Sequence, residues 1–127
     1  MIYLASPYSH PHRIVRERRF QDASRATACL LRSGLNVFSP IVYGHPLVAH
    51  GIPTDWICWE VFGRAYIERC DSLLVLTLEG WEESVGVTAE IEIAHQLGKP
   101  VNYLTLNGDE LADLLPALAA LETEVVS

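Results

Sequence analysis

The sequence predicts an α/β protein whose parallel sheet is covered by helices on both faces. Four short apolar segments alternate with helix-like segments along the 127 residues. These apolar segments are continuous rather than alternating with polar residues, which is typical of strands buried on both faces. We therefore expect one domain over residues 1–127, a three-layer α/β/α fold with a Rossmann-like (flavodoxin-like) sheet of four to five strands.

The elements follow one another in the order β-α-β-α-β-α-β-α. The first strand, 1–5, stops at a Ser-Pro pair because proline lacks an amide donor, and a helix follows over 11–33. The second strand, 35–38, stops in the same way, and 41–53, rich in Gly, Pro and His, is predicted to be a loop. The remaining elements are a helix from a Thr54 or Asp55 cap to Arg69, a strand over 72–78, a helix over 85–97, a strand over 101–105 and a closing helix over 109–121.

One carboxylate falls among the apolar positions of the helix predicted over 85–97. At about 100° per residue, Glu90 lies inside the apolar arc of this helix. A carboxylate directed toward a core is costly unless it is paired, protonated or used. Ser84 is a plausible N-cap, and Gly86 leaves open space one turn before Glu90. The position suits a nucleophilic glutamate; the alternative is a structural Glu bonded to a neighbouring Tyr or Arg.

Composition narrows the possible partners. The net charge of −7 argues against a nucleic-acid polymer, which needs a basic face. A small anionic ligand remains possible, and Arg13, close to a helix start, is the basic residue best placed to meet one. The apolar runs are too short to span a membrane, and the chain begins with a strand rather than a signal peptide. We expect a cytoplasmic protein without a membrane partner.

Metal and cofactor motifs are absent from the sequence. Cys29, Cys58 and Cys70 lack paired metal-ligand spacing and are interpreted as reduced, largely buried thiols. The first loop contains no glycine, so a dinucleotide fingerprint is missing, as are a Walker loop and a serine-hydrolase elbow. We therefore expect no metal and no cofactor.

Ligands of parallel sheets bind beyond the carboxyl ends of the strands. The loops predicted there are 6–12, 39–53 and 79–86, and they supply a carboxylate, hydroxyls and helix-start amides. Such groups suit reaction at the anomeric carbon of a sugar, because a carboxylate stabilises or traps an oxocarbenium-like state. The candidate catalytic residues are Glu90 and Asp55, and the candidate substrate-binding residues are Tyr3, Ser6, Tyr8, Ser9, Arg13, Ser39, His45, Ser84 and Gly86.

Two motifs resemble a known family. Tyr-Leu-Ala-Ser-Pro-Tyr-Ser, from Tyr3 to Ser9, and Ser-Val-Gly-Val-Thr-Ala-Glu, from Ser84 to Glu90, are similar to the nucleoside 2-deoxyribosyltransferase superfamily, within a bacterial branch that begins with the first motif. The resemblance covers about residues 1–105, including Asp71 before the third strand. It implies that Glu90 attacks C1′ of a ribosyl or deoxyribosyl group, that Tyr3 orients Glu90, and that the chain forms a symmetric homo-oligomer.

Two positions bear on the substrate that the resemblance implies. Free-nucleoside transferases carry Asp where this chain has Ser84, whereas the nucleotide hydrolase branch carries Ser in a phosphate-binding loop. The resemblance therefore favours a 5′-phosphorylated substrate. Many members carry an Asp that contacts the base where this chain has Gly63, so Asp55, His45 or Glu60 would have to protonate a leaving base.

Three functions remain open at this point. The first is cleavage or transfer at the N-glycosidic bond of a nucleotide or nucleoside. The second is a non-catalytic module of the same fold that binds a nucleotide or an ADP-ribose-like ligand, which the missing Asp at position 63 favours. The third is a phosphoribohydrolase, whose Gly-Thr-x-x-Glu element is only partly matched by 86–90.

Overall fold

The structure is a computed structural model that describes residues 1–106. Its sheet contains four parallel strands: β1 (Ile2–Ala5), β2 (Val37–Phe38), β3 (Ser72–Leu76) and β4 (Val101–Leu104). The helical elements are α1 (Arg13–Arg32), α2 (Pro40–Gly44), the 3-10 helix η1 (His45–His50), α3 (Trp56–Arg69) and α4 (Val85–Gln96). The predicted α/β/α class and its parallel sheet are confirmed.

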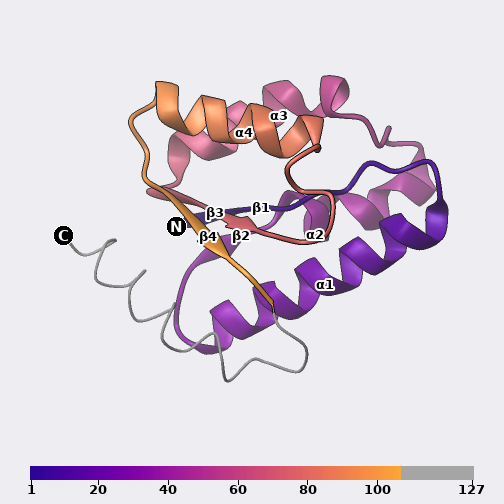
Figure 1. Ribbon diagram of the computed structural model, residues 1–127, viewed down its shortest axis with the longest axis horizontal. Coiled ribbons are helices and arrows are strands. Elements are labelled where there is room, and N and C mark those ends of the chain that lie inside the picture. Colours follow the sequence, from indigo (N-terminus) through magenta and orange to yellow (C-terminus); the bar gives the residue numbers. More distant parts are fainter. Residues whose placement is uncertain (107–127) are drawn as a thin grey trace.

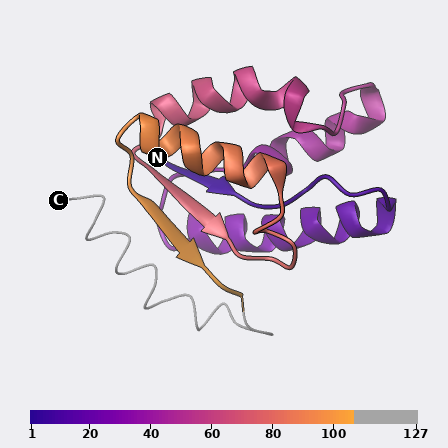
Figure 2. The same ribbon diagram turned by 45° about the horizontal axis from the view of Figure 1, so that its top comes forward.

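Helices cover both faces of the sheet, α1 on one side and α3 with α4 on the other (Figures 1 and 2). Alternate residues of β1 pack against the two helix layers in turn, because successive side chains of a strand point to opposite faces of the sheet. Ile2 and Leu4 pack in the core that contains the α1 residues Ala26 and Leu30. Tyr3 and Ala5 instead pack in the core formed with α3 and α4. Tyr3 therefore faces the helix layer that carries Glu90.

The strand order β2-β1-β3-β4 creates a switch point between two central strands. From β1 the chain continues outward through α1 to β2, whereas from β3 it continues through α4 to β4 on the other side. The segments that leave β1 and β3 therefore diverge at their shared carboxyl edge. Parallel α/β sheets bind their ligands in the crevice at such a point.

The prediction of a loop over 41–53 is wrong for residues 41–50, which are helical, and is confirmed for 51–53. Ser39 caps α2 by accepting a hydrogen bond from the backbone N–H of Val42 at 3.2 Å, and Pro40 occupies the first turn. Proline is well tolerated there because the first-turn amides have no helical partner. Helix η1 follows directly and ends at Gly51, whose φ of 93° is readily adopted by glycine.

Element ends also differ from the predictions. The second strand is shorter than 35–38, and β3 ends at Leu76 because the chain turns there, with the Leu78 amide donating to the Leu76 carbonyl at 2.9 Å. The predicted closing helix over 109–121 lies outside the described residues. Cys29 and Cys70 are buried, as expected, but Cys58 is exposed. Over residues 1–106, no helix has both the length and the hydropathy needed to cross a bilayer.

Candidate functional site

A cavity of about 420 Å³ opens beside the carboxyl ends of β1 and β2, under α3 and the start of α4. Its walls come from segments far apart in the sequence: the first loop, α2 with η1, the beginning of α3, and residues 83–86 before and within α4. Such a volume falls in the range of small-molecule sites. Nine of the predicted site residues line it: Tyr3, Ser6, Tyr8, Ser9, His45, Asp55, Ser84, Gly86 and Glu90.

Glu90 is a buried carboxyl group in the wall of this cavity. Only 4% of the residue is exposed, and its Oε2 accepts a hydrogen bond from the phenol of the fully buried Tyr3. Burial raises the pKa of Glu90 to about 8, although the hydrogen bond from Tyr3 favours the ionised form. Burial, followed by the neighbouring Glu90, raises the pKa of the Tyr3 phenol well above its ordinary value. Burial therefore favours the protonated form of Glu90, and the Tyr3 phenol also keeps its proton.

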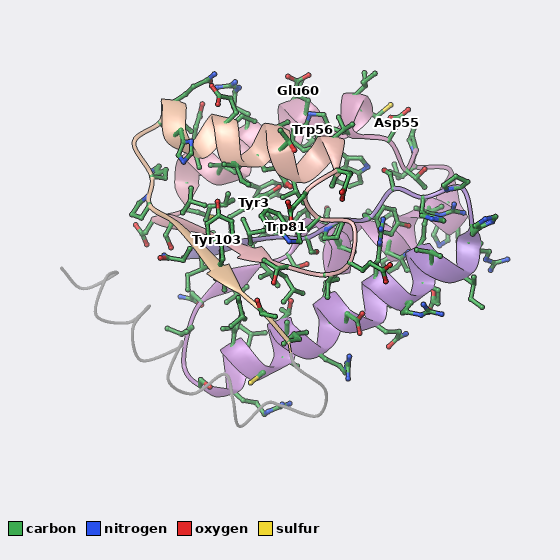
Figure 3. All side chains as sticks on the ribbon, viewed as in Figure 1. Tyr3, Asp55, Trp56, Glu60, Trp81 and Tyr103 are labelled. Atoms are coloured by element: carbon green, nitrogen blue, oxygen red, sulfur yellow. The ribbon has the colours of Figure 1, made fainter. Side chains whose placement is uncertain are left out.

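The indole of Trp56 lies against two glycines close to this pair. A Cβ atom built on Gly63 would come within 3.0 Å of Trp56 Cη2 and 3.4 Å of the Tyr3 hydroxyl oxygen. A Cβ on Gly86 would lie 3.6 Å from Trp56 Cε3. The space expected to be open in front of Gly86 is thus bounded by the indole. Figure 3 labels Trp56 at the beginning of α3 and Tyr3 on the central strand. The two glycines allow a large aromatic ring to form the wall next to Glu90.

The beginning of α4 contributes polar groups to the cavity. Ser84 is the N-cap, and its Oγ accepts from the Val87 amide at 3.2 Å, as the sequence predicted. The Ser84 hydroxyl still has a proton to donate, and the first-turn amides of α4 have no helical acceptor. Glu83, which is exposed, also lines the cavity and places a carboxylate near this helix start.

Two groups of the first loop face the cavity differently. Ser6 is 5% exposed, and its Oγ has no hydrogen-bond partner within residues 1–106. Tyr8 is paired: its hydroxyl lies 2.7 Å from His45 Nδ1, and His45 Nε2 lies 2.7 Å from Glu17 Oε2. A chain of three polar side chains thus crosses from α1 to the cavity. Within the described residues, Ser6 is left as an unpartnered group in the cavity wall.

Arg19 holds the first loop against the segment after β3. Its guanidinium donates to the Ser9 carbonyl at 3.0 Å and to the Glu79 carbonyl at 3.2 Å. Ser9 in turn donates its hydroxyl proton to the Thr54 carbonyl at 2.6 Å. These bonds fix the two edges of the cavity relative to each other.

Four of the residues named from the sequence do not lie in the cavity wall. Arg13 is exposed at the beginning of α1, and Glu60 is exposed on the outer face of α3. Ser39 is buried and serves as the cap of α2 rather than as a ligand contact. Asp71, which the resemblance included, is exposed and pairs with the amino group of Met1 at 2.6 Å.

Asp55 lines the cavity but is already engaged. It is exposed, and its Oδ1 accepts from the Cys58 amide at 3.2 Å as the N-cap of α3. The hydrogen bonds to Cys58 lower the pKa of Asp55. An Asp held in its ionised form is poorly suited to give a proton to a leaving base, so the structure favours the capping role.

Sequence reasoning missed several residues of the site. Glu17 contacts His45 from 28 positions away, and nothing local to either residue indicates this pairing. Phe38 and Tyr66 both line the cavity, with ring centroids 4.0 Å apart and planes inclined by 13°. The sequence features that could have indicated them are the position of Phe38 at the end of a strand and the position of Tyr66 on the inner face of α3.

No group of three or more His, Cys, Asp or Glu side chains within the described residues is arranged to hold a metal ion.

The site residues fall within the segment that one family model matches. No curated protein matches the chain. A family model described as a domain of unknown function, DUF1937, matches residues 1–105, which include every side chain discussed above. The chain belongs to the DUF1937 family.

Proposed function

We propose that this protein cleaves or transfers at the N-glycosidic bond of a nucleotide or nucleoside, with Glu90 as the nucleophile. The observation that carries the proposal is the buried carboxyl of Glu90, held by Tyr3 in the wall of a cavity of about 420 Å³. A buried carboxyl with a single tyrosine partner and a strongly raised pKa is a candidate for chemistry. The resemblance of 84–90 to the nucleophile segment of nucleoside 2-deoxyribosyltransferases supports the same role.

The reaction balances with Glu90 as the attacking group. Glu90 first loses its proton to solvent. An oxygen of the resulting carboxylate forms a bond to C1′ of the sugar while the bond from C1′ to the base nitrogen breaks, and the electron pair stays on that nitrogen. A neutral base then takes up a proton from solvent. Tyr3 donates a hydrogen bond to the carboxyl and fixes its direction. Water or a second base then attacks C1′ and releases Glu90 as a carboxylate. The oxocarbenium-like state is positively charged, so it stabilises the ionised form that burial disfavours in the free protein.

We propose that a 5′-monophosphate is preferred to a free nucleoside. The neutral Ser84 at the beginning of α4 and the unpartnered hydroxyl of Ser6 support this preference. The carboxylate of Glu83 opposes it, and Arg13 is not in the cavity wall to offset that charge. Titration of one nucleotide and its nucleoside tests the order. Tighter binding of the free nucleoside would reject it.

A second candidate function is ligand binding without turnover. It is favoured by the engagement of two candidate proton donors, since Asp55 caps α3 and both nitrogens of His45 are paired within the described residues. A protonated Glu90 would then act as a hydrogen-bond donor to a nucleotide or ADP-ribose-like ligand.

The homo-oligomer implied by the resemblance is also a proposal. It is supported by exposed apolar residues beside the cavity: Ile57 is 80% exposed, Val61 75% and Val85 71%. Burial of such groups against a second copy is favourable. Light scattering of the parent and of Val61→Glu tests it; an unchanged monomer mass in both would reject it.

The function is tested by incubating the protein with a panel of nucleotides and deoxynucleotides and measuring free base by chromatography. Glu90→Gln keeps the shape but removes the nucleophilic charge, so release of base should fall by at least about a hundredfold while ligand binding survives. Glu92→Gln is the matched control, because Glu92 is exposed on the same helix and bonds only to Gln96 within the described residues. Release by Glu90→Gln within tenfold of the parent would exclude Glu90 as nucleophile. Binding without release by the parent would favour the second candidate.

A further inference from the structure

The cavity wall combines aromatic rings with carboxyl groups and lacks a strong cation. Trp56, Trp59 and Phe38 are among the aromatic residues that line it, and Asp55 and Glu83 contribute exposed carboxyl groups. Of the lining residues in the described part of the chain, none is Lys or Arg. A wall of this composition favours a ligand with positive charge on an aromatic ring, because ring faces and carboxylates both attract cations.

Trp56 is the aromatic ring best placed to act on the reacting end of a ligand. Its six-membered ring lies over Gly63, close to the Tyr3 hydroxyl that holds Glu90. The indole is the strongest of the aromatic side chains in attracting cations. A cationic base departing from C1′ beside Glu90 would therefore lie within reach of the indole.

Three titratable groups of the cavity wall, Asp55, His45 and Tyr8, are poorly suited to protonate a leaving base. Asp55 is committed to the amide of Cys58, and its pKa is lowered. His45 is engaged at both ring nitrogens, by Tyr8 and by Glu17. Burial raises the pKa of the Tyr8 phenol, which makes it a weaker acid. Gly63, close to the Tyr3 hydroxyl, has no side chain that could supply an acid, and it leaves room for Trp56.

We propose that the substrate is an N-glycoside whose base already carries a positive charge, such as an N-ribosyl pyridinium or an N-alkylated purine nucleotide. The proposal rests on the function proposed above and names its substrate class. Glu90 loses its proton to solvent, and an oxygen of the carboxylate bonds to C1′. The bond from C1′ to the cationic nitrogen breaks and its electron pair neutralises the base, so the leaving group takes up no proton. Water then bonds to C1′, the ester bond to Glu90 breaks, and the proton lost by that water passes to solvent.

Two matched pairs of mononucleotides test this substrate class. The first is nicotinamide mononucleotide and its reduced form, and the second is 7-methylguanosine monophosphate and guanosine monophosphate; each pair shares sugar and phosphate. Base release is measured by chromatography and expressed relative to uncatalysed hydrolysis, which removes the greater intrinsic lability of the cationic compounds. Binding to Glu90→Gln is measured by calorimetry, where each cationic member should bind about fivefold more tightly than its neutral partner.

Substitutions of tryptophan test whether the Trp56 indole causes the preference for the cationic nucleotides. Trp56→Leu should bring the two members of each pair to within about twofold of each other in binding. Trp81→Leu is the control: Trp81 packs on Tyr103 with centroids 5.5 Å apart and does not line the cavity, so it should leave the fivefold preference intact (Figure 3). Circular dichroism confirms that each variant is folded. Should Trp56→Leu unfold, Trp56→Phe should retain part of the preference.

The outcomes separate the two proposals. Glu90-dependent release from cationic members, with a larger rate enhancement than for neutral ones, supports the substrate class. Glu90-dependent release from neutral nucleotides with equal or smaller enhancement for cationic ones overturns it and leaves the N-glycosidic function standing. Equal binding of both members of each pair to Glu90→Gln also overturns it. No release from any nucleotide rejects the function and the substrate class together.

Discussion

Replacing Glu90 by Gln should make the protein more resistant to unfolding at alkaline pH. The pKa of Glu90 is raised from 4.5 to about 8 in the folded protein by burial, whereas the unfolded chain restores the ordinary value. Between these two values the folded state binds more protons than the unfolded state, so the free energy of unfolding falls as pH rises. The stability due to the protonated carboxyl is fully present below about pH 4.5 and is lost as the pH passes through about 8.

The size of the effect follows from the width of that window. The interval from 4.5 to 8 is 3.5 pH units, and at about 1.36 kcal/mol for each unit it gives about 5 kcal/mol. Only about 3 of these units lie between pH 5 and pH 9, and relaxation around the charge and entry of water reduce the effect further, so we expect a relative gain of about 2–4 kcal/mol for Glu90→Gln over this interval. Such a gain is large against a total stability of about 5–15 kcal/mol.

The assay is urea unfolding of the parent and variant, followed by tryptophan fluorescence at pH 5, 7 and 9. Other titrating groups are common to both proteins, so their contributions cancel in the difference between the two unfolding free energies. Glu92→Gln serves as control and should stay within about 0.5 kcal/mol of the parent at each pH, because Glu92 is exposed. A difference between parent and Glu90→Gln that does not change with pH would refute burial as the cause of the raised pKa.

Three further predictions follow from the same geometry. If Glu90 is the nucleophile, kcat/KM should rise with pH and level off above about 8, opposite to stability; a profile that is flat from pH 6 to 9 would contradict this. Gly63→Asp should lower the free energy of unfolding, measured with urea, by about 1–3 kcal/mol, because the new Cβ would lie 3.0 Å from the Trp56 indole. Adding Trp56→Leu to this variant should recover much of the loss, whereas additive losses of the two substitutions would exclude a clash between these side chains. Arg19→Met should speed hydrogen exchange of amides 6–12, because three carbonyl contacts are lost, whereas an unchanged pattern would show that Arg19 does not hold this loop.

The strands and caps were accessible from the sequence because they depend on neighbouring residues. The apolar runs that form β1 and β3 require only that a strand be buried on both faces. Ser84 and Asp55 cap their helices by bonding to an amide three residues later, so the motif is read within a few positions. The wrong prediction of a loop within 41–53 also has a local cause. Gly, Pro and His are typical of loops, but proline is also common in the first turn of a helix, as it is in α2 and η1.

The burial of Glu90 was determined by the sequence alone, since its position inside the apolar arc of α4 follows from helix periodicity. Its environment was decided only by the tertiary structure. Tyr3 meets Glu90 across 87 positions, and Trp56 fits between Gly63 on its own helix and Gly86 on the next. Periodicity and capping act over one or two turns, whereas these contacts depend on how α3 and α4 pack on β1. The same packing removes Glu90 from water, and so it sets the pKa on which the proposed chemistry depends.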